Sequence, residues 1–215
     1  MYDDIARYWR GLNQALSSTS MEDINRVAGE LQACLERGGI VFPLGNGGSA
    51  ATAAHFACDL AKGTRVDDLP TFRVICPTDN VASITAWAND CDYSEALAEQ
   101  IAPFAGQDDV IFAISTSGNS LNVLRAVERG KSAGAVVVAL TGRHGGALAR
   151  MADLTIRVQS DSIEQVEDAH VAICHCVCVA LRSWIQRAKA QSRVDQDAAP
   201  LVSSSFDRSV VLTPE

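Results

Sequence analysis

Two side chains that can exchange protons or bind a metal lie four residues apart, directly after a glycine-rich turn. The turn is GNGGS at residues 45–49, and His55 and Asp59 follow it. Residues four apart share one face of a helix, so we expect the imidazole and the carboxylate to lie side by side. The pair is typical of proton transfer or of a metal site, although an ordinary surface His/Asp pair has the same spacing.

Two segments rich in glycine and hydroxyl groups are typical of anion-binding turns. In GNGGS, Gly47 and Gly48 let backbone N–H groups approach a ligand, and Ser49 lies at the start of the expected helix. A second turn, STSGNS, offers the hydroxyl groups of Ser115, Thr116, Ser117 and Ser120. Both turns follow expected strands, whose carboxyl ends meet at one edge of a parallel sheet. They predict a small phosphorylated ligand rather than a nicotinamide dinucleotide, because the dinucleotide pattern fits only the first turn.

A long apolar helix near the end of the sequence carries three more polar residues, Glu167, His170 and His175. The segment SIEQ has the form of a capping box, which predicts that this helix begins at Ser162. Polar side chains among apolar ones are usually paired, bound to a ligand or at a surface. We interpret His170 as structural.

Five short apolar segments, which alternate with helical ones, predict the strands of the fold: GIVFPLG, TFRVICP, DVIFAIS, AVVVALT and DLTIRV. Buried strands that alternate with helices are typical of a three-layer α/β sandwich with a parallel sheet. Two amphipathic segments precede them, at residues 5–16 and 24–35, the second after a cap at Ser20. Each is expected to be a helix with one buried face.

The overall composition is that of one soluble domain, with 215 residues, 47% of them apolar and 20% charged. A net charge of -8 and a pI near 5.0 argue against nucleic-acid or anionic-membrane partners. No apolar stretch approaches the roughly 20 residues of a membrane span, and seven cysteines without CxxC spacing are typical of reduced cytoplasmic thiols. We expect a cytoplasmic protein with one domain at residues 1–189 and a polar tail at residues 190–215.

Taken together, these motifs resemble the sugar isomerase (SIS) family, and within it the phosphoheptose isomerases. The resemblance covers about residues 1–188 and rests on GNGGSAATAAHFACDL, TAWAND, ISTSGNSLNVLRA, ALTGRHGG and QVEDAHVAICH, in the family's order. It implies an α/β fold with a five-stranded parallel sheet and a homotetramer with sites between subunits. It also implies aldose–ketose isomerisation of sedoheptulose 7-phosphate to D-glycero-D-manno-heptose 7-phosphate through an enediol.

The resemblance also implies roles for single residues. Substrate contacts are implied for Asn46, Gly47, Gly48, Ser49, Asn89, Asp90 and Glu167, and a phosphate cradle for Ser115, Thr116, Ser117 and Ser120. Zinc or another divalent metal is implied at His55, Asp59, Glu167 and His175. Of these four, Asp59 and His175 are the implied proton-transfer groups.

Two positions depart from the family pattern: Asp59 stands where the family has a catalytic glutamate, and Glu167 where it has a metal-binding glutamine. These departures leave isomerisation of another phosphorylated sugar open, as well as a non-catalytic SIS module that binds a sugar phosphate or a protein. Glu167 and His175 are eight residues apart, about 12 Å along a straight helix. One metal can therefore bind both only if the side chains lean together or two subunits share the site.

Overall fold

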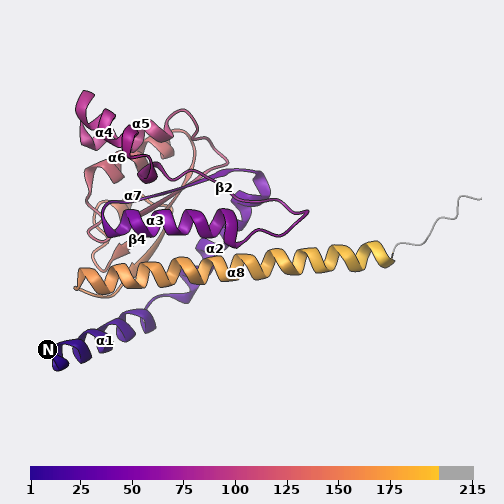
Figure 1. Cartoon of the computed structure of the whole chain (residues 1–215), viewed down its shortest axis with the longest axis horizontal. Helices are drawn as coiled ribbons and strands as arrows, with labels where there is room; N and C mark the ends of the chain where they lie inside the picture. Colours follow the sequence, from indigo (N-terminus) through magenta and orange to yellow (C-terminus); the bar gives the residue numbers. More distant parts are fainter. Residues whose placement is uncertain (199–215) are drawn as a thin grey trace, which may run out of the picture.

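The computed structural model describes residues 1–198, with side chains through residue 191. Five parallel strands form its sheet in the order β2-β1-β3-β4-β5. The strands are β1 (Ile40–Leu44), β2 (Arg73–Val74), β3 (Val110–Ser115), β4 (Val136–Gly142) and β5 (Leu154–Val158). Each coincides with one of the five predicted segments, although β4 runs one residue further, to Gly142, and the predicted three-layer α/β fold is confirmed (Figure 1).

Helices cover both faces of the sheet because successive strand residues point to opposite sides. On one face, Val110, Phe112 and Ile114 of β3 pack in a core with α2, α3 and α8. On the other, Ile111 and Ala113 pack against α5, α6 and α7. These helices are α2 (Met21–Arg37), α3 (Gly48–Cys58), α5 (Ala98–Ile101), α6 (Leu121–Ser132), α7 (Leu148–Met151) and α8 (Ile163–Ala198).

The remaining elements lie around this sandwich. They are α1 (Tyr2–Ser17), the π-helical turn η1 (Asp59–Gly63), the 3₁₀ turns η2 (Pro77–Asp79) and η3 (Tyr93–Glu95), and α4 (Val81–Asp90). No residue of α4 is buried. Since α4 is largely apolar, it presents an exposed apolar surface within the described chain, and such surfaces are typical of interaction sites.

The first two helices have similar patterns but different surroundings. The expected buried face of α2 is confirmed, because Ile24, Val27, Leu31 and Leu35 are all buried, and Ser20 accepts the predicted capping hydrogen bond from the Asp23 N–H. For α1 the expectation is confirmed only in part, because Leu12 and Ala15 are buried whereas Ile5 is 52% and Trp9 59% exposed. The reason is placement: α1 extends away from the sheet and contacts α8 (Figure 1).

Contact between α1 and α8 includes two hydrogen bonds. The Tyr8 hydroxyl donates a hydrogen bond of 2.5 Å to Asp168, and this bond raises the pKa of Tyr8 to about 12. The Gln165 side chain donates to the Tyr8 carbonyl oxygen. Polar contacts therefore hold α1 in place while much of its apolar face stays exposed.

Helix α8 begins at Ile163, as the motif at Ser162 predicts, with the Ser162 hydroxyl accepting from the Gln165 N–H at 3.4 Å. It continues to Ala198, beyond the boundary expected at residue 189, and residues 199–215 of the expected tail lie outside the described residues. The segment Ile163–Gln191 is long and apolar enough to cross a membrane by length and composition. Its buried side packs into the sheet core, as in core helices of globular domains.

Candidate functional site

The first glycine-rich turn joins β1 to α3 and lies against a carboxylate. Gly47 has a φ of +54°, which favours glycine. A Cβ at Gly48 would come within 2.5 Å of the Glu167 carboxylate, so this side chain would have to move aside. Glu167 thus places its negative charge over the N-terminus of α3, where helices attract anions. Ser49, a predicted substrate contact, is buried beneath the turn.

A pair of amides ties this first turn to the helix that follows the second. Asn46 and Asn122 donate to each other at 2.8 and 2.7 Å, and the Tyr93 hydroxyl donates to Asn46 at 3.0 Å. The Asn46 side chain, predicted to contact substrate, therefore positions the turn. Asn122 and Tyr93 were missed from the sequence, although Asn122 is only two residues beyond the STSGNS turn.

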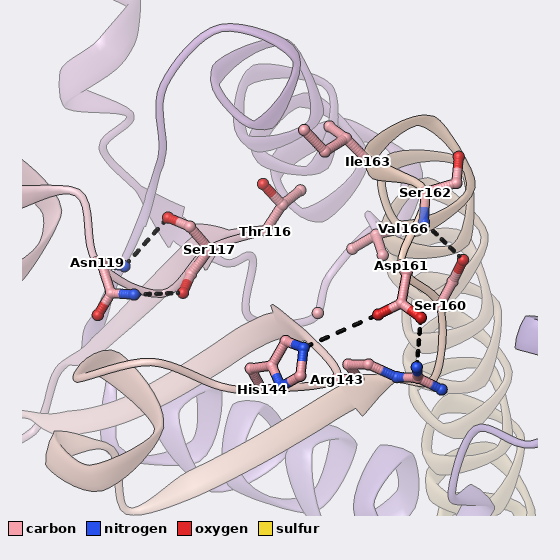
Figure 2. A pocket seen from close by; sticks show the side chains of 11 residues that line it. Thr116, Ser117, Asn119, Arg143, His144, Ser160, Asp161, Ser162, Ile163 and Val166 are labelled. Carbon is pink, nitrogen blue, oxygen red and sulfur yellow. Dashed lines mark hydrogen bonds and ion pairs between the residues drawn. The ribbon is translucent and has the colours of Figure 1, made fainter.

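The second turn divides its hydroxyl groups between the interior and two cavities. Ser115 is buried, and its hydroxyl accepts from the Gly118 N–H at 3.1 Å. Thr116 and Ser117 line a cavity of about 400 Å³ (Figure 2). Ser120 lines a neighbouring cavity of about 370 Å³ with Asn46, Tyr93 and Asn122. Of the four predicted hydroxyl groups, those of Ser115 and Ser117 accept hydrogen bonds inside the turn, Ser117 from the Asn119 N–H at 3.2 Å.

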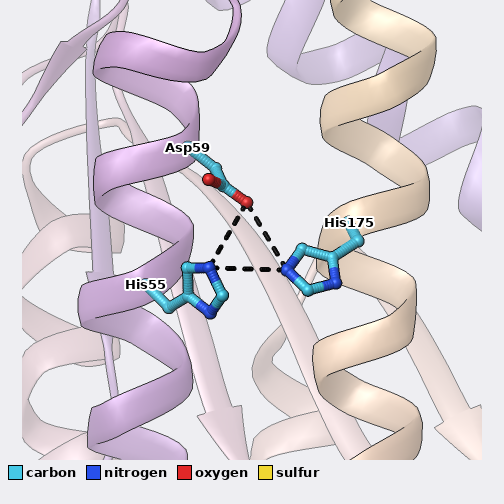
Figure 3. Close-up of side chains that lie close together, drawn as sticks. All are labelled: His55, Asp59 and His175. Carbon is cyan, nitrogen blue, oxygen red and sulfur yellow. Dashed lines mark hydrogen bonds and ion pairs between the residues drawn. The ribbon is translucent and has the colours of Figure 1, made fainter.

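His55, Asp59 and His175 come together between α3 and α8 (Figure 3). The His55 and His175 Nε2 atoms are 3.5 Å apart. The Asp59 Oδ2 atom is 3.8 Å from His55 Nε2 and 3.6 Å from His175 Nε2. We call these three residues the His–Asp–His cluster. His55 and Asp59 share one helical face as their spacing predicts, and the packing of α8 adds His175.

The geometry of the cluster fits a divalent metal. A triangle with sides of these lengths has a centre about 2.1 Å from each corner, which is the usual distance from zinc to imidazole nitrogen or carboxylate oxygen. The three side chains are half-buried or exposed, so an ion can reach them. One nitrogen of each imidazole and one carboxylate oxygen are suitable zinc ligands.

Two predicted groups lie away from the cluster. Glu167, the fourth predicted metal ligand, is absent from the candidate metal-binding groups found among the described residues, because two helical turns on α8 separate it from His175. Its role as a metal ligand stays a prediction, which requires a site shared between two subunits. Asn89 and Asp90 are exposed at the end of α4, which contacts η2 and η3. The Asn89 amide donates to Asp90 at 2.8 Å.

Asp59 marks a change in the helix that carries it. From Asp59 the backbone continues as the π-helical turn η1, in which the Thr64 N–H donates to the Asp59 carbonyl oxygen at 3.1 Å. On α8, Arg182 donates to the Gly63 carbonyl oxygen at 2.5 Å and holds the end of this turn. Such turns often occur at functional sites, since they redirect the side chains around them.

His170 is the buried member of the polar groups on α8. Its side chain is fully buried, and neither ring nitrogen has a hydrogen bond of good geometry among the described residues. Burial lowers the pKa of His170 to about 4, and the nearby Thr141 backbone opposes this shift in part. A neutral buried imidazole agrees with the structural interpretation.

Comparison with known proteins identifies the class to which this fold and site belong. The SIS domain family model matches residues 6–142. A probable phosphoheptose isomerase of Thermoplasma volcanium is 33% identical, over 84% of this chain and 92% of the relative. A phosphoheptose isomerase of Shewanella sp. (strain ANA-3) is 38% identical, over 73% of this chain and 81% of the relative.

A solved structure agrees with these sequence relatives. The phosphoheptose isomerase of Francisella tularensis superimposes with a TM-score of 0.79 at 36% identity, covering 85% of this chain and 98% of that one. The chain belongs to the SIS family and, within it, to the phosphoheptose isomerase group.

Proposed function

We propose that this protein interconverts sedoheptulose 7-phosphate and D-glycero-D-manno-heptose 7-phosphate. Its family membership makes it a sugar-phosphate isomerase. The observation that carries the finer proposal is the His–Asp–His cluster, in which His55 and Asp59 follow the first glycine-rich turn along α3 and His175 joins them from α8. The glycine-rich turn and a proton-transfer site are thus joined by α3.

In the proposed reaction, Asp59 removes a proton from the carbon beside the sugar carbonyl group, which gives an enediol. His175 moves a proton between the two neighbouring oxygens, and the proton held by Asp59 returns to the adjacent carbon. His175 Nε2 lies 3.6 Å from Asp59 Oδ2, so both groups can reach the same pair of carbons. Positioned acids and bases of this kind contribute about 10² to 10⁴ in rate.

We propose that His55, Asp59 and His175 hold zinc or another divalent cation. Such an ion would polarise the oxygens of the substrate. A carboxylate bound to a cation is a weaker base, so the roles of Asp59 as ligand and as base compete. Glu167 lies beside Gly48, where its carboxylate can accept hydrogen bonds from sugar hydroxyl groups.

We also propose a homotetramer in which neighbouring subunits complete the site. The exposed apolar residues of α1 and the uncovered α4 support this assembly, because isolated chains rarely leave such faces in water. Asn89 and Asp90 on α4 would then contact a site shared with another subunit. We expect this enzyme of carbohydrate metabolism in the cytoplasm, without nucleic-acid or membrane partners.

A second candidate is isomerisation of a different phosphorylated sugar. It is favoured by Asp59, whose side chain is one methylene shorter than the family's glutamate, and by the charge of Glu167. An alternative that is not an enzyme is a non-catalytic SIS module, which binds a sugar phosphate or a protein. The retained His–Asp–His cluster favours an enzyme over that module.

A proton NMR time course of sedoheptulose 7-phosphate with the pure protein tests the proposal. We expect new aldose signals, and exchange of the transferred hydrogen in D₂O. Parallel samples with other ketose phosphates test the second candidate, and the Asp59→Asn variant is the matched control. Binding of these sugars without conversion of any of them would contradict both enzyme proposals and favour the module.

A further inference from the structure

The cavity of about 400 Å³ beside the STSGNS turn has a charged wall that the proposed function leaves unused. Thr116 and Ser117 line one side, and the other side carries Arg143, His144 and Asp161 (Figure 2). We call these three residues the charged wall. The cavity size lies within the 300–1,000 Å³ of small-molecule sites, so one ligand can contact both sides.

Glycine contacts hold the charged wall against the STSGNS turn. Gly145 and Gly146, which follow His144, have φ angles of +72° and +60°. A Cβ at Gly118 would lie 2.0 Å from the Gly145 carbonyl oxygen, and one at Gly146 would lie 2.5 Å from that of Gly118. Side chains at these positions would force the two loops apart.

Backbone hydrogen bonds complete this connection. The Gly142 N–H donates to Thr116 at 3.0 Å, and the Leu148 N–H donates to Gly118 at 2.9 Å. The Ala147 N–H donates to the Asn119 side chain at 3.0 Å. The backbone that carries Arg143 is therefore fixed beside Thr116.

Within the charged wall, both basic residues turn toward one carboxylate. Arg143 forms an ion pair with Asp161, and His144 Nε2 lies 3.8 Å from the other Asp161 oxygen (Figure 2). The side chains of Arg143 and Asp161 are 40% and 71% exposed. Ion pairs this open to water are weak, so an anion with more charge can replace Asp161 as the partner of Arg143.

A phosphate monoester is such an anion. It carries nearly two negative charges at neutral pH, and its oxygens accept two parallel hydrogen bonds from a guanidinium group. The alternative position, at the N-terminus of α3, already holds the Glu167 carboxylate. Like charges repel, so phosphate is favoured in the cavity of Arg143 rather than beside Gly48.

We propose that Arg143 and His144 form the basic half of the phosphate site, opposite Thr116 and Ser117, and that Asp161 is an internal counter-ion which phosphate displaces. The proposal rests on the proposed function only in taking a phosphate monoester as the ligand. It predicts opposite effects for two neighbouring residues. Removing the Arg143 charge weakens phosphate binding, whereas removing the Asp161 charge strengthens it.

The test is a titration of the full-length protein with inorganic phosphate, followed by calorimetry and ³¹P NMR. We expect Arg143→Gln to raise the dissociation constant about tenfold, the loss of a charge-assisted hydrogen bond, and Asp161→Asn to lower it several-fold. Arg125→Gln is the matched control, because Arg125 pairs with Glu95 and Glu128 on the exposed side of α6. Sedoheptulose 7-phosphate should follow the same order as inorganic phosphate, and unphosphorylated sedoheptulose should not.

The phosphate-binding measurements test this proposal independently of catalytic turnover. Unchanged phosphate affinity in Arg143→Gln would overturn it, as would weaker binding in Asp161→Asn, which would make Asp161 a support for Arg143. If Arg143→Gln does not fold, the exposed Asp161→Asn change still gives the deciding sign. Absence of turnover on every sugar phosphate would count against the proposed function alone.

Discussion

The cavity beside the STSGNS turn and the His–Asp–His cluster are built in different ways. Backbone contacts between Gly118, Gly145 and Gly146 shape the cavity wall. The cluster instead consists of three side chains from two packed helices. A site built on backbone geometry suits an anchor of constant shape, while side chains supply groups that gain and lose protons. Changes in the two regions should therefore separate into effects on KM and on kcat.

The largest expected effect is on the cluster. Asp59→Asn keeps the size of the side chain but removes the base, so we predict a fall in kcat of about 10² to 10⁴ with near-normal KM. His175→Ala should cause a similar loss. Asp59→Glu, which restores the family's residue type, should keep part of the activity. Steady-state kinetics measure all three, and a parent-level kcat in Asp59→Asn would remove Asp59 from its proposed role.

The second prediction is that the same three side chains bind a metal, which is measured through metal content and the effect of chelation. We expect His55→Ala to lower the bound metal below one ion per chain, as measured by elemental analysis, while the oligomer measured by light scattering stays intact. Chelation of the parent protein should reduce turnover at least about 100-fold, and zinc should restore it. Full activity in a metal-free sample would leave the cluster as acid, base and hydrogen-bond partners only.

The third prediction concerns the stability of the scaffold between the two regions at low pH. It rests on His170, which lies on α8 beside Thr141, near the end of β4. Its folded-state pKa of about 4 is below the value of 6.5 for a free histidine, so the unfolded chain binds more protons between these values and stability falls as the pH drops. We expect this residue to cost about 2 kcal/mol of unfolding free energy between pH 7 and pH 5.

Denaturant unfolding at pH 7 and pH 5 measures this difference. His170→Leu should lose less stability on acidification than the parent, by about that amount. His144→Gln, which removes an exposed histidine, is the control and should keep the parent's pH dependence. Equal pH dependence in His170→Leu and the parent would show that His170 is not buried in its neutral form.

The smallest expected effect lies in the STSGNS turn. Ser117→Ala combined with Ser120→Ala should raise KM for the phosphorylated sugar about tenfold, or roughly 1.4 kcal/mol, with little change in kcat. Melting temperature should hardly change, because Ser117 is exposed and the side chain of Ser120, the N-cap of α6, makes no capping hydrogen bond. Ser132→Ala, at the exposed end of α6, is the control. A parallel loss of melting temperature and affinity would contradict a binding role for these hydroxyls.

The sequence pattern predicted much of the site's local structure, but it did not predict which residues come together there. The spacing of His55 and Asp59 predicted a shared helical face, and the cluster has it. The same pattern reasoning gave α1 a buried face, and only its second half has one, because amphipathicity does not tell whether the same chain covers the whole face. Arg143, His144 and Asp161 were missed as site residues, although two basic residues between a strand end and a glycine pair were a usable signal.

By itself the sequence determined the five strands, the cap at Ser20, the start of α8 and the two strand-end turns, because apolar periodicity, capping and glycine conformation act over a few residues. Only the tertiary structure decided that His175 joins His55 and Asp59 while Glu167 lies over Gly48. It alone brought Arg143 beside Thr116. These contacts join residues far apart in the chain, and they depend on how α8 packs against α3 and on how closely glycine lets two loops approach.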